Sequence, residues 1–307
     1  MVVLTVATRG SDLALAQTKL VISKLQRIYP DIQIKIKKIT TKGDRDNRTA
    51  LWELKTSGFF TSQIEDALLA GVADFAVHSF KDLPTHPRDG LTIAAVCERQ
   101  FAQDCLIASE PAVSIETLKP HAKIGTSSLR RMVQIKRLRP DAKLSPVRGN
   151  ITTRIKRLTE GKFDAIILAQ AGIERLSLAE KIAFSFNPTQ FIPAPAQGAL
   201  AVQTRCDDAE TNKVIAAIDD EKSRIITLAE REILVTMKCG CHAPVGAFAR
   251  VTGDDIEIYA FISDLAGKIF LTRRIKGPAA EANKLARKLA NELLEVGGKR
   301  ILQELEK

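Results

Sequence analysis

The chain has 307 residues, which is enough for two or three domains that each bury a core. With 45% hydrophobic and 27% charged residues, its composition is that of a globular protein. No apolar run approaches the length of roughly 18 residues that a membrane span needs. Residues 1–10 lack the basic start of a signal peptide. We therefore expect a cytoplasmic protein without a membrane segment.

The net charge of +10, from 46 Lys and Arg against 36 Asp and Glu, favours an anionic partner. Nucleic acid is one candidate, but aromatic residues make up only 5%, which disfavours a base-stacking surface. A smaller polyanion fits the charge equally well. The five cysteines are scattered and odd in number, so they predict a reducing compartment instead of a disulfide framework.

The first hundred residues alternate strand and helix patterns. A compact apolar run opens the chain, Ser11 can cap the helix that follows it, and the next segment alternates strictly between polar and apolar residues. This alternation predicts a mainly parallel sheet covered by helices. The predicted strands are 2–7, 32–37, 72–77 and 91–96, and a second helix is predicted at 61–69.

The same rhythm restarts after about residue 100. Pro140 ends a basic helix, and Gly161 closes another that starts at Asn150. Two similar α/β units in tandem predict two lobes around a cleft, where ligands commonly bind. The turn-rich segment 191–200 predicts a crossover that returns the chain to the first lobe. The predicted strands are 105–108, 142–147, 163–169 and 200–204, and the basic helix is 127–139.

The last third predicts a small α+β domain. A long helix at 220–237 precedes three alternating strands, and a final helix carries apolar residues from Ala282 to Val296 on one face. The strands are predicted at 245–251, 256–262 and 269–275. The resulting domain division is 1–98 with 199–216, then 99–193, then 219–307.

Arginines recur where predicted helices begin. Arg9, Arg130, Arg131, Arg148 and Arg154 each lie near a helix N-terminus, where the helix dipole disfavours a cation. A bound anion would remove the mismatch, and the guanidinium fork suits carboxylate or phosphate. The alternative is that each arginine lies on a solvated helix face and pairs with a local Asp or Glu.

Two further segments carry candidate chemistry. Asp82, beside Lys81 and just past a predicted strand, could act as a general acid or base or could stabilise a developing cation, although a turn-capping role before Pro84 is also open. The segment 239–246 begins Cys-Gly-Cys-His. It lacks a second ligand pair at zinc-site spacing, so a reactive thiol is favoured over a metal site, and an inert buried cysteine stays open.

Together these motifs resemble the porphobilinogen deaminase (hydroxymethylbilane synthase) family from end to end. The motifs are ATRGS at 7–11, HSFKDLP at 78–84, GTSSLRR at 125–131, RGNITTR at 148–154 and PAPAQGA at 193–199. The resemblance implies a transferase that joins four porphobilinogen units head to tail, releases ammonia at each step and frees hydroxymethylbilane by hydrolysis. It implies two lobes like those of periplasmic binding proteins, with mainly parallel sheets, plus a small α+β C-terminal domain, and a dipyrromethane cofactor on a cysteine thioether. We expect porphobilinogen and its oligomers as partners, a monomer, and no metal, nucleic acid or membrane partner.

The resemblance also assigns residues. Asp82 would protonate or orient the leaving amine and stabilise the cationic pyrrole, and Cys241 would carry the cofactor. Phe60 and Lys55 would belong to a lid over the substrate. The residues implied to bind the acidic side chains of the cofactor and substrate are Arg9, Ser11, Lys81, Ser128, Arg130, Arg131, Arg148, Gly149, Arg154, Arg175 and Gln197.

Three positions depart from the family pattern. Cys239 stands where the pattern has glycine, which gives the chain a second candidate thiol, and Ser57 stands where the lid usually has lysine. Gln203 stands where an acidic residue is common. Two rival interpretations remain: a solute-binding protein, which would need export, and a nucleic-acid-binding protein, which would bind DNA or RNA in a salt-sensitive way.

Overall fold

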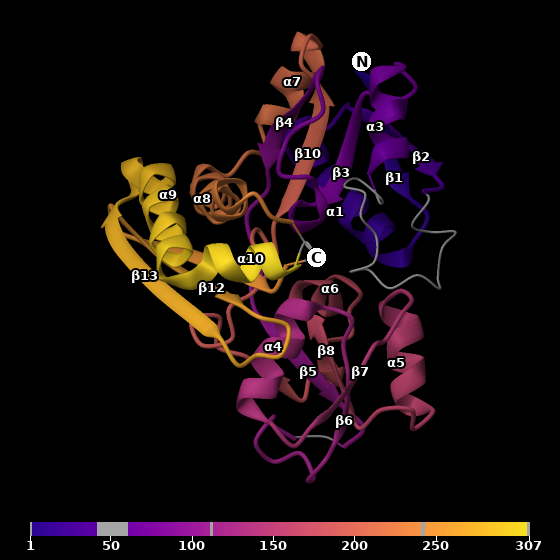
Figure 1. Ribbon diagram of the computed structural model, residues 1–307. Coiled ribbons are helices and arrows are strands. Elements are labelled where there is room, and N and C mark those ends of the chain that lie inside the picture. Colours follow the sequence, from indigo (N-terminus) through magenta and orange to yellow (C-terminus); the bar gives the residue numbers. More distant parts are fainter. Residues whose placement is uncertain (1, 42–60, 111–112, 241–242, 306–307) are drawn as a thin grey trace. The chain divides into compact units, whose positions relative to one another are not determined.

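The computed structural model describes residues 2–41, 61–110, 113–240 and 243–305 (Figure 1). These residues form two compact units. The first unit contains the described residues up to 100 together with 198–224, and the second contains those at 101–197 and from 225 onward. The predicted lid residues Lys55, Ser57 and Phe60 and the predicted cofactor anchor Cys241 lie outside the described residues.

The first unit is built on a five-stranded sheet in the order β2-β1-β3-β10-β4. Strand β1 pairs in parallel with β2 and β3, whereas β10 runs antiparallel between β3 and β4. The strands are β1 (Val3–Arg9), β2 (Gln33–Ile39), β3 (Phe75–Ser79), β4 (Leu91–Val96) and β10 (Leu200–Arg205). The helices are α1 (Asp12–Ile28), α3 (Ser62–Leu69) and α7 (Ala209–Ala216), and α7 was not predicted.

The alternation of side chains along these strands decides which helix covers which face. Val6 and Phe75 pack with Leu25 of α1 and Ile215 of α7 on one face of the sheet. Their neighbours Ala7 and Ala76 point to the other face and pack with Ile64 and Leu68 of α3. The small alanines on that face let α3 approach closely, so the sheet is covered on both sides as an α/β layer structure requires.

The second unit begins with another five-stranded sheet, in the order β7-β6-β8-β5-β9. Strand β6 pairs in parallel with β7 and β8, while β5 runs antiparallel to β8 and β9. The strands are β5 (Asp104–Ala108), β6 (Lys123–Gly125), β7 (Lys143–Ser145), β8 (Ala165–Ala169) and β9 (Phe184–Ser185). The helices are α4 (Leu129–Leu138), α5 (Ile151–Thr159) and α6 (Gln170–Arg175).

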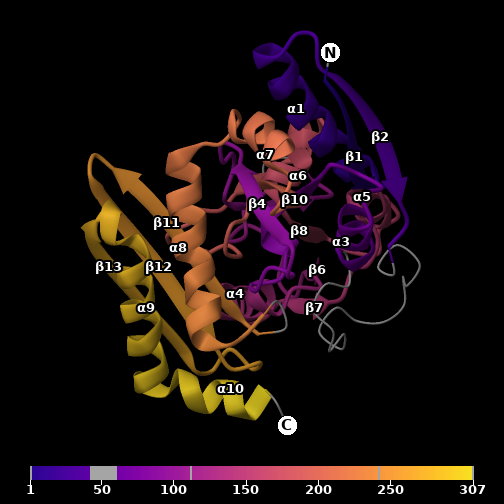
Figure 2. The same cartoon turned by 90° about the horizontal axis from the view of Figure 1, so that it is seen from above.

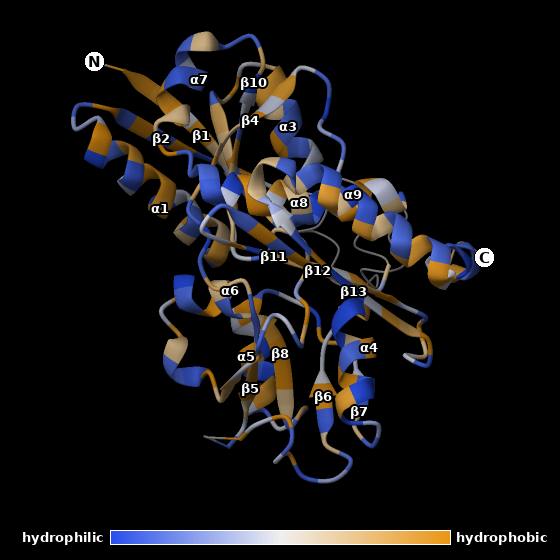
Figure 3. Cartoon of the chain, turned by 90° about the vertical axis from the view of Figure 1, so that its left-hand side faces the viewer, coloured by the Kyte–Doolittle hydropathy of each residue, from blue (hydrophilic) through white to orange (hydrophobic). Residues whose placement is uncertain are grey.

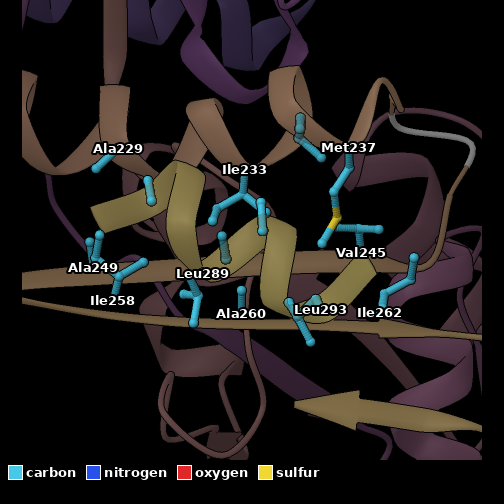
Figure 4. Close-up of a cluster of buried hydrophobic side chains, with 14 of the residues drawn as sticks. Ala229, Ile233, Met237, Val245, Ala249, Ile258, Ala260, Ile262, Leu289 and Leu293 are labelled. Atoms are coloured by element: carbon cyan, nitrogen blue, oxygen red, sulfur yellow. The ribbon is translucent and has the colours of Figure 1, made fainter. Parts of the chain in front are cut away.

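The second unit ends in an antiparallel sheet of β11 (Val245–Thr252), β12 (Asp255–Ser263) and β13 (Phe270–Pro278). Helices α8 (Glu221–Met237) and α9 (Ala282–Leu293) lie along one face of this sheet (Figure 2). The close-up in Figure 4 shows side chains of both helices meeting those of β11 and β12. After α9 a π turn at Leu294–Gly298 leads into α10 (Lys299–Leu305).

Helix α9 shows why this layer holds together. Hydrophobic and hydrophilic residues alternate around it (Figure 3), and its apolar side chains Leu289 and Leu293 are fully buried. Burying a leucine side chain contributes about 1.5–3 kcal/mol. The opposite face of the sheet carries Phe248 and Phe261, which pack on Ile192 and therefore connect this layer to the α/β part of the same unit.

The predicted architecture of two α/β lobes with a C-terminal α+β domain is confirmed. The sheets are mixed, however, because one strand in each lobe runs antiparallel to its neighbours. Strand β10 returns to the first sheet as predicted. The three-domain division stays a prediction. Among the described residues, none of the helices combines the length and apolar character that crossing a membrane would require.

Candidate active site

The candidate residues of the first unit emerge at one edge of its sheet. Strands β1 and β3 are parallel, so Arg9, the last residue of β1, and the turn that follows β3 lie at their shared carboxyl-terminal edge. That turn is a short 3-10 helix, Phe80–Asp82. In open α/β sheets, ligands bind outside the carboxyl ends of strands. The edge therefore presents Arg9, Lys81 and Asp82 where a ligand site is expected.

Hydrogen bonds between side chains fix this edge. Ser11 caps α1 by accepting from the Ala14 amide at 3.3 Å, as its sequence position predicts. Gln17 of α1 donates to Ser79 Oγ at 2.8 Å, which ties the helix to the end of β3. Phe80 is buried, and its amide donates to Ala199. The turn is held through Phe80, whereas the Asp82 side chain is exposed to solvent and available for a substrate.

His78 lies on the buried part of β3. Burial lowers the pKa of His78 from its ordinary value to about 4; the nearby Gln203 side chain opposes this shift and the charge of Arg9 adds to it. The imidazole is consequently neutral near pH 7.

In the second unit the candidate residues also follow parallel strands. Arg130 and Arg131 come after β6, Arg148 after β7 and Arg175 after β8. All four therefore lie in segments that begin at the same edge of the sheet. Strand β5 is antiparallel, so its first residue, Asp104, lies at this edge too, opposite Ala169. The topology thus gathers segments that are up to 71 residues apart in the sequence.

Asp104 is the centre of a buried ion cluster that the sequence did not reveal. Its side chain is fully buried, Arg130 Nη1 lies 2.7 Å from Oδ2, and Arg131 Nε and Nη2 donate to Oδ1 at 3.1 and 2.8 Å. Burial opposes ionisation, but the two guanidiniums outweigh it and hold the pKa of Asp104 well below its ordinary value. Two positive groups and one negative group leave one net positive charge in the cluster.

The cluster explains how Arg130 and Arg131 can lie at the N-terminus of a helix, where the helix dipole disfavours a cation. Neither α4 nor α5 has an acidic residue in its first turn, and Arg130 and Arg131 occupy the first turn of α4. Asp104 supplies the missing anion for that pair from within the chain. The role of Arg130 and Arg131 in ligand binding stays a prediction, and both guanidiniums are buried and held by protein atoms.

Two glutamines complete the cluster. Gln197 is buried and donates to Asp104 Oδ1 at 2.9 Å and to the Ala102 carbonyl at 2.8 Å. Gln134 donates to Ile192 O at 3.1 Å, and its Oε1 accepts from Ile192 N at 2.7 Å. The predicted site residue Gln197 therefore contacts Asp104 directly, and its side chain fixes the position of that carboxylate.

The loop before α5 carries Arg148, whose guanidinium has a nitrogen without an acceptor among the described residues. Gly149 has φ +99°, and a Cβ there would lie 2.7 Å from Thr153 Cγ2, so this turn requires glycine. Arg154 Nε donates to the Gly149 carbonyl at 2.8 Å. Ser127 Oγ links the α4 loop to this turn by donating to Val147 O at 2.7 Å. Arg148 Nη2 is buried without a hydrogen-bond partner among the described residues.

The described cysteines differ in how well they could carry a covalent cofactor. Burial, followed by the charge of Asp104, raises the pKa of the Cys105 thiol to about 12, so this thiol stays protonated and unreactive. Cys97 and Cys239 are also buried, while Cys206 is exposed. In the part of the chain that the structure describes, no group of three His, Cys, Asp or Glu residues is arranged to hold a metal ion.

Sequence reasoning missed Asp104 and Glu230. Asp104 directly precedes an apolar strand, but the sequence does not show that this strand runs antiparallel and brings the carboxylate to the arginines. Glu230 lies in the middle of α8, where a glutamate usually faces solvent, yet it is fully buried. A buried acid at a helical position that should be apolar is the only signal that the pattern offered.

Each unit presents basic side chains at the carboxyl ends of its parallel strands, a placement typical of α/β proteins that bind an acidic small molecule. Comparison with known proteins specifies this class. The family model "Porphobilinogen deaminase, dipyromethane cofactor binding domain" matches residues 4–213, and "Porphobilinogen deaminase, C-terminal domain" matches residues 225–295. The chain belongs to the porphobilinogen deaminase family.

Curated relatives agree over nearly the full length. A porphobilinogen deaminase of Campylobacter curvus is 39% identical, with 100% of this chain and 98% of the relative covered. One of Syntrophobacter fumaroxidans is 37% identical over 99% of this chain and 98% of the relative. Among solved structures, the methionine-binding protein MetQ covers 70% of this chain and 89% of its own, with a TM-score of 0.46 and 10% identity.

The activity is that of the family. The chain is a hydroxymethylbilane synthase, a transferase of tetrapyrrole biosynthesis that condenses four porphobilinogen molecules with release of ammonia. Its matched domain is the one that binds the dipyrromethane cofactor. The predicted family, reaction and cofactor are confirmed. The predicted site residues other than Lys55, Phe60 and Cys241 have described positions in the structure, and the roles of all of them stay predictions.

Proposed function

We propose that Asp82, in the first unit, is the acidic catalytic residue of this enzyme and that the arginines of the second unit bind the carboxylates of its cofactor and substrate. The observation that carries this proposal is that each unit places its family-motif residues at the carboxyl ends of parallel strands. A substrate with acetate and propionate groups needs several cations, and a condensation through a cationic pyrrole needs one carboxylate.

The second unit fits a polycarboxylate cofactor. A buried guanidinium nitrogen without an acceptor, such as Arg148 Nη2, costs about 1–3 kcal/mol or more. A carboxylate would satisfy it with a charge-assisted bond. When bound, the dipyrromethane supplies the pyrrole carbon that the first substrate is joined to. Arg148, Arg154 and Arg175 would hold its acidic groups. The buried cluster of Arg130, Arg131 and Asp104 would support them as a rigid group with a net positive charge.

Asp82 would act at the substrate's aminomethyl group. Its carboxylate would hold and orient the substrate's ammonium group, so that the C–N bond breaks with its electron pair leaving on ammonia, and would offset the positive charge that develops on the pyrrole. The neutral His78 does not compete for this role because burial has removed its proton-donating form near pH 7.

The cysteine that anchors the cofactor is tested by intact-mass measurement. We expect the isolated protein to be heavier than its sequence by two linked pyrrole units, and Cys241→Ser to lose this mass after exposure to porphobilinogen. Cys239→Ser is the matched control and should keep it, because Cys239 is buried. If Cys241→Ser retains the mass, the assignment of Cys241 is wrong.

We also propose that the protein works as a cytoplasmic monomer with no nucleic-acid or membrane partner. Support comes from its cysteines: Cys97, Cys105, Cys206 and Cys239 are not in disulfides, which fits a reducing compartment. Light scattering at micromolar concentration should give a mass near 33.7 kDa. Retention on immobilised duplex or single-stranded DNA at low salt would contradict the expected absence of nucleic-acid binding.

A further inference from the structure

Residues 192–197, which precede β10, lie between two parts of the second unit. On one side is the start of β11, which comes shortly after Cys241 in the chain. Ala247 N donates to Pro193 O at 3.1 Å, and a Cβ at Gly246 would lie 2.9 Å from the carbonyl oxygens of Ile192 and Pro193. Only glycine permits so close an approach, so β11 and residues 192–197 are in direct backbone contact.

On the other side is the ion cluster. Ile192 O accepts from Arg130 Nη1 at 2.9 Å, and the Gln197 side chain donates to Asp104 at 2.9 Å. The two ends of the segment therefore touch two members of the same buried cluster. A shift of the segment by a fraction of an ångström would change the position of Arg130, or of the carboxylate that holds it.

Glu230 of α8 fixes the middle of this arrangement. Its side chain is fully buried, Oε2 accepts from Ala196 N at 2.6 Å and Oε1 accepts from Ala249 N at 2.6 Å. One carboxylate thus bridges the segment and β11. Ala196 has φ +61°, a left-handed conformation that costs a non-glycine residue roughly 1–2 kcal/mol. Strain of this kind persists only where the surroundings impose it, and it is concentrated at functional sites.

We propose that Glu230 is a positioning residue: it locks residues 192–197 to β11 and so sets the place of Arg130 and Asp104 relative to the strand that follows the cofactor-bearing loop. This inference rests on the proposed function, because it gives the cluster a role in holding acidic groups. Glu230 acts through the backbone amides of Ala196 and Ala249, and the proposal assigns it no contact with substrate or cofactor. The purpose of the buried charge is geometric.

The test compares Glu230→Gln with Glu232→Gln. Glu232 lies on the same helix with a partly exposed side chain near Arg287, so the control makes the same chemical change without touching residues 192–197. Glutamine at 230 keeps one acceptor and turns an amide NH2 toward the other backbone N–H. Hydrogen exchange of peptides spanning Ala196 and Ala249 should accelerate by about tenfold at one or both amides, and the control should leave them unchanged.

Activity is measured per holoenzyme, counted by intact mass. We expect kcat of Glu230→Gln to fall by about 10- to 100-fold, as small displacements of positioning groups do, with the control within about twofold. Combining Glu230→Gln with Gln197→Leu should lower kcat by less than the product of the single losses, because both changes release the same segment. Glu230→Asp, which keeps the charge but shortens the reach, provides the same measurements if the glutamine variant does not fold.

The outcomes separate cleanly. If Glu230→Gln lowers only the melting temperature, with kcat per holoenzyme and amide exchange unchanged, Glu230 is a stabilising residue and the inference is wrong. Fully multiplicative losses with Gln197→Leu would also overturn it. If the unaltered protein itself carries no dipyrromethane mass, the proposed function fails, and that result is recorded before any Glu230 variant is measured.

Discussion

Replacing Asp104 with asparagine should destabilise the second unit strongly. The carboxylate is fully buried and meets Arg130 Nη1 at 2.7 Å, Arg131 at 2.8 and 3.1 Å and Gln197 at 2.9 Å. Asparagine has nearly the same shape, but it leaves two buried guanidiniums without a counter-charge and turns an NH2 group toward one of them. Removing one partner of a buried ion pair costs about 3–5 kcal/mol, and we expect a loss in this range.

The assay is urea denaturation followed by circular dichroism at pH 7, with Asp66→Asn as the control. Asp66 pairs with Arg88 at 2.6 Å, but both side chains are largely exposed, so its loss should cost less than about 1 kcal/mol. Equal, small losses for the two variants would refute the reasoning that Asp104 neutralises a buried cation pair.

Lowering the pH provides a second test of the Asp104 ion pairs. The folded-state pKa of Asp104 is held below its ordinary value, so between the two values the unfolded chain binds a proton that the folded chain does not. The stabilisation from Asp104 is therefore complete above an ordinary carboxyl pKa of about 4 and is lost as the pH falls toward the lower, folded-state value. The difference in unfolding free energy between the unaltered protein and Asp104→Asn should shrink on going from pH 7 to about pH 3. A constant difference would contradict the depressed pKa.

Two further predictions concern the proposed catalytic group and the loop before α5. Asp82→Asn should keep the covalent cofactor by intact mass but lower kcat on the order of 10²- to 10⁴-fold, and near-normal turnover would remove Asp82 from the mechanism. Gly149→Ala should cost about 1–3 kcal/mol more than Gly161→Ala in denaturation, because a Cβ at 149 meets Thr153 at 2.7 Å whereas one at 161 meets nothing within 4 Å. Equal costs would show that Thr153 gives way.

Local patterns predicted most elements of this fold because the signals are short in range. The final helix followed from apolar residues at helical spacing, and Leu289 and Leu293 are buried as that pattern requires. The strand predicted at 72–77 starts instead at Phe75, because Val72 N and Ala73 N donate to Ala67 O and complete the turn that ends α3. The sequence did not predict the direction of individual strands, since an apolar run looks the same whichever way it is paired.

The residues of the candidate site also differ in whether the sequence could predict them. Arg9, Asp82 and Arg148 could be proposed from the sequence because each lies at the end of a strand or a few residues after it, which is a local feature. Asp104 could not, because its partners are 26 and 27 residues away and meet it only through the antiparallel placement of β5. Similarly, Glu230 reaches Ala196 across 34 residues of sequence. Contacts that depend on strand direction and on helix docking leave no periodic trace in the chain.

Because of the buried cluster, the number of arginines in the motifs does not equal the number of guanidiniums that can bind carboxylates. Counting every motif arginine as a ligand for carboxylates overstates the positive charge that a substrate meets, because Asp104 neutralises part of it and both Arg130 and Arg131 also donate to backbone carbonyls. Arg148 differs, since one of its nitrogens has no acceptor among the described residues. A carboxylate placed near Arg148 gains a new charge-assisted bond, whereas one placed near Arg130 must share a guanidinium that is already held in place. Affinity for acidic groups should therefore depend more on the loop before α5, and the precision with which they are held should depend more on Asp104 and its neighbours.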